Sequence, residues 1–210
     1  MERLAGEPSL GPERLTADAL RYQFRSPPAW KPERCADIQY ASDGALTPAA
    51  VLMPIVLRDE GLALVLTQRT AHLSEHAGQV SLPGGRSEPE DVSAIATALR
   101  ESEEEIGLAR RHVEVLGTLP DYVTATGFLV TPVVGLVHPP ITLTADPFEV
   151  AEIFEVPLGF LMNGMNHQHR SVELPGGAGR RSFYAMPYEQ YFIWGATAAM
   201  LRNLFQFLRA

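Results

Sequence analysis

Three glutamates, Glu101, Glu104 and Glu105, lie close together in a segment with helical periodicity. On a helical wheel of about 100° per residue, Glu105 falls about 40° to one side of Glu101 and Glu104 about 60° to the other. Ile95 and Leu99 fall on the far side, so we expect that face to pack and the opposite face to present the three carboxylates. Carboxylate oxygens on rigid helical positions suit Mg²⁺ or Mn²⁺, with water and a substrate phosphate completing the coordination shell.

The simpler interpretation of these charges is a solvated acidic helix face. Two details favour a metal site. Glu101 and Glu105 are like charges spaced i,i+4, which costs about 0.2–0.5 kcal/mol, and the last turn of a helix disfavours anions because of the helix dipole. A divalent cation would offset both costs. Arg100 is expected to orient one of the carboxylates through a charge-assisted hydrogen bond.

A glycine pair, Gly84-Gly85, precedes the acidic segment. Because glycine has no side chain, the backbone there can approach a ligand closely. A loop of this kind that leads into an acidic helix allows loop carbonyls and helix carboxylates to share one metal cluster. The helix that must position the carboxylates is predicted at residues 92–106, with Gly107 as its C-terminal cap.

The other elements are predicted from hydrophobic patterning and turn residues. Strands are predicted at residues 49–57, 62–68, 113–119, 128–137 and 183–187, and helices at residues 16–24, 157–162 and 196–208. The first two strands form a hairpin around a four-residue turn at 58–61. Strands on both sides of one central helix, without strict β-α-β alternation, indicate a mixed-sheet α/β domain.

Residues 1–46 are rich in proline and weakly patterned, so we interpret them as an N-terminal extension of a single domain at residues 47–210. The formal net charge of −8 argues against non-specific nucleic-acid binding. No apolar stretch approaches the roughly 20 residues that span a bilayer, so we expect no membrane partner and a cytoplasmic location. The single cysteine, Cys35, excludes an intrachain disulfide.

The stretch Arg100-Glu101-x-x-Glu104-Glu105-x-Gly107-Leu108, with Gly84-Gly85 upstream, resembles the Nudix box of Nudix hydrolases. Two details depart from the usual pattern. Gly85 and Arg100 are 100 − 85 = 15 positions apart, one more than is common, which places Asp91 where the pattern has its first glutamate. Ser102 replaces the usual aliphatic residue.

The residues before this box are similar to a second motif found in the coenzyme A pyrophosphatase branch of the family. The matching pieces are Leu66-Thr67-x-Arg69, Gly78-Gln79-Val80 and Pro83-Gly84-Gly85, while Leu82 stands where phenylalanine is commoner. Members of this branch share the one-residue insertion and the sequence found here at residues 97–101. Further similarity lies at residues 131–135 and 191–195, and the resemblance extends over residues 47–205.

The resemblance implies a Nudix-type α/β/α sandwich around a central mixed β-sheet. It also implies that a metal-activated water attacks a diphosphate. Glu101 and Glu105 would then be the principal ligands of Mg²⁺ or Mn²⁺, with Glu104 as a third. Glu149 matches a position that supplies an extra carboxylate in some Nudix enzymes, as a base or a ligand; the alternative is an exposed glutamate before a strand.

Contacts with a small nucleotide-type substrate are expected from Arg69 and Gln79 of the second motif and from Gly84 and Gly85. An acidic protein that takes a polyanion needs local positive charge, and arginine can grip phosphate in a bidentate way. The alternative for Arg69 is a surface ion pair with a neighbouring carboxylate.

The leading hypothesis is a metal-dependent pyrophosphohydrolase that cleaves coenzyme A or its thioesters to 4′-phosphopantetheine, or its acyl form, and adenosine 3′,5′-bisphosphate. The substrate rests on resemblance alone. One alternative is a Nudix hydrolase of another nucleoside diphosphate derivative, such as ADP-ribose or a nucleotide sugar. The other is a Nudix-fold binding module without catalysis, against which the intact set of Glu101, Glu104 and Glu105 argues.

Other candidate residues receive ordinary roles. Residues 72–76 match the zinc-protease pattern H-x-x-E-H, but that motif needs a continuous helix and Gly78 follows at once. His167 and His169 lie in a loop with glycine and asparagine, and we expect them to be solvated. The predicted terminal helix is typical of packing in the core or between the subunits of a homodimer.

Overall fold

Long apolar strands form the centre of the protein, which a computed structural model describes at residues 3–33, 45–71, 78–173 and 179–210. Strand β2 (Thr47–Arg58) pairs in parallel with β8 (Phe128–Val137) and antiparallel with β3 (Gly61–Arg69). Most side chains in the middle of these strands are buried, as expected for strands that are covered on both faces. With β6 (Val113–Thr118) beside β8, the sheet has the order β4-β3-β2-β8-β6.

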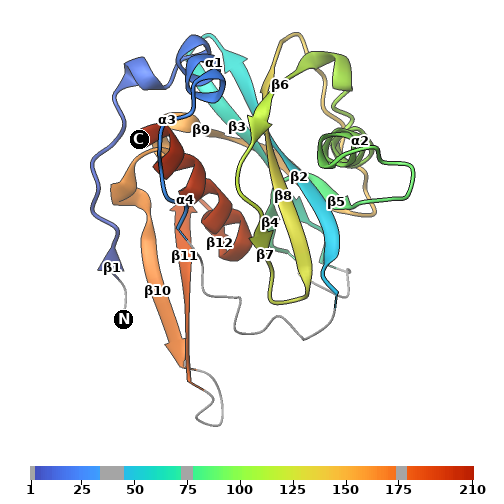
Figure 1. Ribbon diagram of the computed structural model, residues 1–210. Coiled ribbons are helices and arrows are strands. Elements are labelled where there is room, and N and C mark those ends of the chain that lie inside the picture. The colour runs from blue at the N-terminus through green and yellow to red at the C-terminus, as the bar shows by residue number, and fades with distance from the viewer. Residues whose placement is uncertain (1–2, 34–44, 72–77, 174–178) are drawn as a thin grey trace.

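Helices cover both faces of this sheet. Figure 1 shows α2 (Ala94–Ile106) on one side of β2, β5 and β8, and α4 (Gly195–Arg209) on the other. The buried side chains accordingly form two apolar clusters, one towards each helix. The predicted α/β/α sandwich around a central mixed sheet is therefore confirmed.

Short strands complete the central sheet. Strand β4 (Val80–Ser81) pairs with β3, and β5 (Gly84–Arg86) pairs with β2, so the segment around Pro83 crosses between the two long strands. Strand β7 (Tyr122–Val123) pairs with β8, and β9 (Val150–Pro157) pairs with β3. The Val80–Ser81 end of this segment thus lies beside the end of β3, and the Gly84–Arg86 end lies beside the start of β2.

A second, antiparallel sheet lies beside α4, with the strand order β1-β10-β11-β12. Its strands are β1 (Arg3–Leu4), β10 (Gln168–Glu173), β11 (Arg180–Tyr188) and β12 (Tyr191–Trp194). The short helices of the chain are η1 (Pro12–Arg14), η3 (Arg110–His112), α3 (Leu158–Leu161) and η4 (Gly164–Asn166). Strand β11 includes the predicted strand at 183–187, whereas β10 was not predicted.

The N-terminal segment packs along the C-terminal helix. Helix α1 (Ala17–Arg25) begins at the predicted cap, since Thr16 Oγ1 accepts a hydrogen bond from Ala19 N at 3.1 Å. Leu20 is fully buried in the core cluster that includes α4. The division of the chain at residue 46 into an extension and a domain stays a prediction.

Three predictions about local structure were wrong. The hairpin turn has two residues, not four, because Arg58 pairs with Gly61. Helix α2 begins at Ala94, since Ser93 Oγ caps it by accepting from Ala96 N, and Val92 before it is 93% exposed. His167 was expected in solvent but is fully buried, whereas His169 is exposed.

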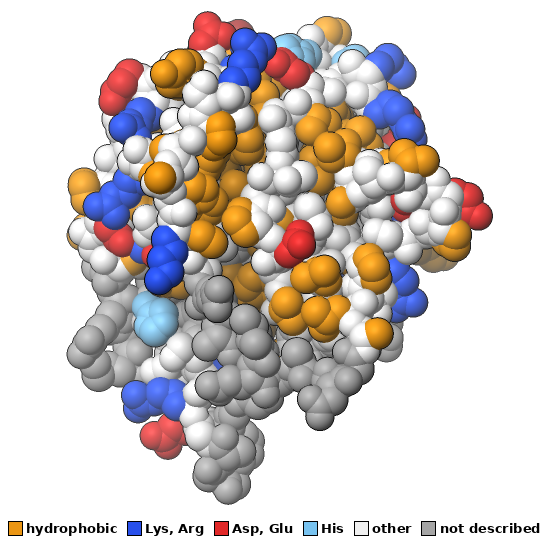
Figure 2. Space-filling model, in the orientation of Figure 1, with side chains coloured by type: hydrophobic (Ala, Val, Ile, Leu, Met, Phe, Trp, Pro, Cys, Tyr) orange, Lys and Arg blue, Asp and Glu red, His pale blue; other side chains and the backbone are white. Residues whose placement is uncertain are grey.

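The surface seen in Figure 2 is mixed. Apolar side chains gather in its middle, over the region of α4, β6 and β8, and most charged side chains lie around them. None of the helices that the structure describes has the length and apolar character to cross a lipid bilayer.

Candidate active site

Helix α2 carries the acidic residues, and its ends explain where it begins and stops. Ser93 caps its N-terminus, and Gly107 ends it in the left-handed conformation at φ 67°, which favours glycine. Glu105 was expected on a solvent-facing acidic side, but only 6% of the residue is exposed. The wheel placed Glu105 correctly beside Glu101, but it could not show that the chain around Gly84 covers that side.

Glu105 is the most enclosed of the three carboxylates. Its Oε2 accepts a hydrogen bond from Gly84 N at 3.0 Å, and its Oε1 lies 4.0 Å from Nη1 of Arg69. Burial raises the pKa of Glu105 to about 7, and the negative charges of Glu149 and Glu101 add to the rise. Burial and the neighbouring carboxylates thus raise the free energy of the ionised form of Glu105.

The glycine pair gives the helix room to approach the sheet. A Cβ at Gly85 would lie 2.5 Å from Cδ of Glu101, which is closer than real contacts allow. A Cβ at Gly84 would lie 2.4 Å from the carbonyl oxygen of Ala50, and Gly84 also has a positive φ of 153°. Any other residue at these two positions would push Glu101 or β2 away.

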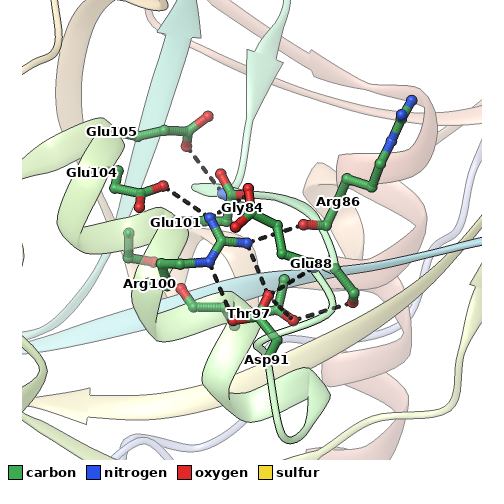
Figure 3. A network of polar contacts seen from close by, with 12 residues as sticks. Gly84, Arg86, Glu88, Asp91, Thr97, Arg100, Glu101, Glu104 and Glu105 are labelled. Carbon is green, nitrogen blue, oxygen red and sulfur yellow. Dashed lines mark hydrogen bonds and ion pairs between the residues drawn. The ribbon is translucent and has the colours of Figure 1, made fainter.

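Arg100 links the carboxylates, as Figure 3 shows. Its Nη1 lies 2.9 Å from Oε2 of Glu104 and 3.0 Å from Oε1 of Glu101. Its Nη2 donates to the carbonyl oxygen of Arg86 at 3.1 Å. The prediction that Arg100 orients a carboxylate agrees with this geometry. The glutamates differ in their exposure and contacts. Glu104 is exposed and pairs with Arg100, whereas Glu105 is enclosed.

Asp91 supports Arg100 from the opposite side, a role that the sequence analysis did not assign. Its carboxylate accepts hydrogen bonds from Arg100, from Thr97 Oγ1 at 3.0 Å and from Glu88 N at 3.0 Å. The signal was present in the sequence, since Asp91 occupies the position of the first glutamate of the resembled pattern.

The second motif and Glu149 meet the acidic helix at the end of β3. Arg69 N donates to the carbonyl oxygen of Gln79 at 2.9 Å, and Thr70 N donates to that of Glu149 at 3.0 Å. The charge of Glu149 is close enough to raise the pKa of Glu101, after burial as the main cause. Arg69, Gln79 and Glu149 therefore lie at the end of the sheet that faces Glu105.

The structure thus brings together all the residues that the sequence analysis proposed for the site. They are Arg69, Gln79, Gly84, Gly85, Arg100, Glu101, Glu104, Glu105 and Glu149. Their roles stay predictions. The zinc-protease pattern at residues 72–76 and Cys35 lie outside the described residues. A cavity of about 490 Å³ beside Phe24, Trp30 and Phe207 includes none of the proposed residues.

The donor set fits a hard divalent cation. It offers carboxylate oxygens only, with more negative than positive charge, and burial together with neighbouring carboxylates raises the pKa of Glu101 and Glu105. Within the described part of the chain, no three His, Cys, Asp or Glu side chains are already grouped as a metal site. Arg100 contacts Glu101 and Glu104, whereas Glu105 accepts from Gly84 N and lies 4.0 Å from Arg69.

Comparison with known proteins gives one family and a group of relatives. The NUDIX domain family matches residues 46–171. The chain is 42% identical over 186 residues to the Nudix hydrolase NudL of Photorhabdus laumondii subsp. laumondii, covering 89% of this chain and 93% of that protein, whose name calls it uncharacterized. It is 45% identical over 156 residues to NudL of Escherichia coli K12, also named uncharacterized, with 74% and 80% covered.

Solved structures are more distant. One is a Nudix hydrolase from M. smegmatis, RenU, with 22% identity and a TM-score of 0.47 over 56% of this chain and 81% of that one. Another is a MutT/nudix family protein from Enterococcus faecalis, with 15% identity and a TM-score of 0.47 over 91% of this chain and 73% of that one.

Proposed function

The chain belongs to the Nudix hydrolase family, and we propose that it hydrolyses the diphosphate of coenzyme A or of its thioesters. Nudix hydrolases act on nucleoside diphosphate derivatives and generally use divalent metal ions such as Mg²⁺ or Mn²⁺. The products would be 4′-phosphopantetheine, or its acyl form, and adenosine 3′,5′-bisphosphate.

The observation that carries the proposal is the contact between the second motif and the acidic helix. The motif that resembles the coenzyme A branch includes Arg69, whose guanidinium lies 4.0 Å from the enclosed Glu105. A cation at that distance from a carboxylate can bind the phosphate of a substrate that reaches the same carboxylate. The substrate assignment itself continues to rest on the resemblance.

Glu101 and Glu105, with Glu104 as a third, would hold the metal. A bound divalent ion lowers the pKa of water and neutralises charge that develops on phosphate oxygens. The residues around the carboxylates position them. Gly84 N orients the Glu105 carboxylate, and Arg100 keeps Glu101 and Glu104 on one side of the helix.

Glu149 would accept a proton or add a ligand. Its backbone is fixed by the hydrogen bond from Thr70, and its charge acts on both Glu101 and Glu105. Arg69 would bind the diphosphate at the end of β3 and so hold it against the carboxylates. Glu105 is largely enclosed. Bulk water therefore competes less with the protein for interactions with the Glu105 carboxylate.

Product analysis tests the proposal. The purified protein is incubated with coenzyme A, an acyl-coenzyme A, ADP-ribose and a nucleotide sugar, each with Mg²⁺, with Mn²⁺ and with EDTA. We expect 4′-phosphopantetheine and adenosine 3′,5′-bisphosphate from coenzyme A, and none in EDTA. Faster turnover of ADP-ribose or of the nucleotide sugar would assign the chain to another Nudix activity.

A Glu105→Gln variant is the control for a contaminating hydrolase. It keeps the shape of the side chain and the acceptor for Gly84 N, but removes the charge. Activity that persists unchanged in this variant would not belong to the proposed site.

A further inference from the structure

Phe148 projects into solvent from a turn whose backbone is fixed. Phenylalanine is among the residue types that are most often buried, yet Phe148 is 75% exposed. Its N–H donates to Oδ1 of Asp146 at 2.8 Å, and its carbonyl oxygen accepts from Oγ1 of Thr70 at 2.9 Å. The ring is therefore exposed on an anchored turn.

The turn is also tied to the helix that carries the carboxylates. Asp146 N donates to the carbonyl oxygen of Glu105 at 2.9 Å, and Val150 N donates to the carbonyl oxygen of Asp146 at 2.8 Å. Residues 146–150 thus connect the end of α2 to the start of β9. These bonds fix the backbone of the turn relative to the backbone of Glu105.

Phe148 is close to the cation of the proposed site. Arg69 is paired with Val150, and the bond from Thr70 to Glu149 extends this antiparallel pairing by one residue. The hydrogen bond from Thr70 Oγ1 to the carbonyl oxygen of Phe148 at 2.9 Å places Phe148 beside Thr70, the residue that follows Arg69. A ligand held by Arg69 would therefore lie near Phe148.

We infer that Phe148 stacks on the base of the nucleoside half of the substrate. This inference rests on the proposed function and adds a residue that selects the nucleoside. An exposed ring offers one flat face, which suits a planar base, and stacking on an aromatic side chain tolerates any base. A flexible pantetheine chain needs a groove to gain as much contact.

The charges around Phe148 also distinguish the two halves of the substrate. Asp146 and Glu149 flank the ring in sequence and both carry carboxylates, which repel a phosphate placed directly on it. Arg69 is the cation beside them. The favoured arrangement is therefore a phosphate on Arg69 and an uncharged base on Phe148.

Steady-state kinetics of Phe148→Ala test the inference. We expect KM for coenzyme A to rise about 10-fold, within the range for loss of one base–aromatic stack, with kcat changing little. Phe148→Trp should restore the wild-type KM, because a larger ring keeps the stack. Tyr22→Ala is the matched control, since Tyr22 is 71% exposed on α1 and should leave KM unchanged.

Binding of the two products separates the halves of the substrate. As measured by calorimetry, Phe148→Ala should weaken the binding of adenosine 3′,5′-bisphosphate about 10-fold. The affinity for 4′-phosphopantetheine should not change. Equal affinities for the nucleotide in wild type and variant would overturn the inference. So would a loss of affinity for 4′-phosphopantetheine, which would place the other half of the substrate on the ring.

The substrate panel keeps this outcome apart from the proposed function. If the wild type cleaves ADP-ribose and not coenzyme A, the proposed substrate is wrong, and Phe148→Ala must then raise KM for ADP-ribose to support stacking. If coenzyme A is cleaved and Phe148→Ala leaves its KM unchanged, the proposed function stands and the inference is wrong.

Discussion

Arg100 grips Asp91 through two hydrogen bonds, from Nε to Oδ1 at 3.2 Å and from Nη2 to Oδ2 at 2.9 Å. These bonds hold the pKa of Asp91 well below its usual range. The same guanidinium reaches Glu101 and Glu104. The pair therefore connects the loop before α2 to the proposed metal ligands, and the direction of Arg100 depends on Asp91.

Asp91→Asn should lower both stability and activity. Hydrogen bonds to charged groups contribute roughly 1.5–3 kcal/mol, so a loss of about 2 kcal/mol would lower Tm by about 4–8 °C in a chain of this size. We expect kcat to fall about 10-fold, because Arg100 is then free to pull Glu101 and Glu104 out of place. Calorimetry and steady-state kinetics measure the two effects.

Asp18→Asn is the control for this prediction. Asp18 also pairs with an arginine, Arg21, at 2.8 Å, but its side chain is exposed and its pair should contribute little. An Asp91→Asn variant that behaves like Asp18→Asn would show that the ion pair does not position Arg100.

Sequence patterns predicted most of the long elements, although not β9, because each of those predicted has a clear local signature. Strands β2, β3, β6 and β8 are apolar runs bounded by turn residues, and α1, α2 and α4 have helical periodicity. The short strands were missed for a physical reason. Gly84-Gly85 is typical of a loop, but it pairs with β2 and so forms part of strand β5. Strand β10 consists mostly of polar residues and has no apolar face of its own.

The site was predictable in its residue types but not in its burial. The spacing of Glu101, Glu104 and Glu105 identifies one helix side, and the motif residues supply Arg69. Whether Glu105 is enclosed depends on Gly84, which is 21 residues away. His167 is a similar case, because its burial depends on Arg202, 35 residues further along the chain.

Glu105→Gln should remove most of the activity and leave the fold intact. The glutamine can still accept the hydrogen bond from Gly84 N, so the packing is kept. Loss of one charged ligand should lower kcat about 100-fold or more at saturating Mg²⁺. Glu103→Gln is the matched control, since Glu103 is exposed on the same helix and pairs with Arg110. Near wild-type turnover in Glu105→Gln would reject Glu105 as a metal ligand.

Metal binding should raise the thermal stability of the wild type. A ligand at about 100 times its Kd that binds only the folded state adds about 2.7 kcal/mol, or roughly 5–11 °C in Tm. Mg²⁺ or Mn²⁺ should also reduce the repulsion between Glu101 and Glu105. The increase should be smaller in Glu105→Gln. Scanning calorimetry in EDTA and in millimolar metal checks this, and equal Tm values in both would count against a metal site.

Arg69→Ala should weaken the use of coenzyme A. Loss of a charge-assisted contact with phosphate is expected to lower kcat/KM roughly 10- to 100-fold. If Arg69 binds the ground state and the transition state equally, the change falls on KM; if it grips the diphosphate more tightly in the transition state, kcat falls too. Arg58→Ala, in the ion pair with Glu155, is the control. Unchanged kcat and KM would move this role to another residue, with Gln79 the next to test.

His167 should make the protein lose stability in mild acid. Its Nε2 lies 2.7 Å from the carbonyl oxygen of Leu161, which can only accept, so Nε2 carries the proton. Its Nδ1 then accepts from Nη1 of Arg202 at 3.1 Å. A second proton would set an N–H against the N–H of Arg202, in a fully buried place. Burial, with the charge of Arg202, lowers the pKa of His167 to about 4.

The direction of the pH effect follows from this difference. Between about pH 4 and 6.5 the unfolded chain binds a proton at His167 that the folded protein does not, so stability falls as pH falls through that window. The full effect is about 3 kcal/mol. Glu7 and Glu33, which also contact Arg202, have lowered pKa values and lose their contribution only below about pH 4.5. We therefore assign the loss of stability between about pH 4.5 and 6.5 to His167 and not to these two glutamates.

Urea unfolding at a series of pH values from neutral to mildly acidic measures this term against His167→Gln. A glutamine can donate to the carbonyl oxygen of Leu161 and accept from Arg202, but it does not titrate. The variant starts less stable because it fills the site less well, so the comparison is between slopes, not absolute values. We expect the wild type to lose more free energy of unfolding than the variant as the pH falls towards 4.5. Parallel curves would mean that His167 takes up its proton without opposing Arg202, and that the acid sensitivity of the fold lies elsewhere.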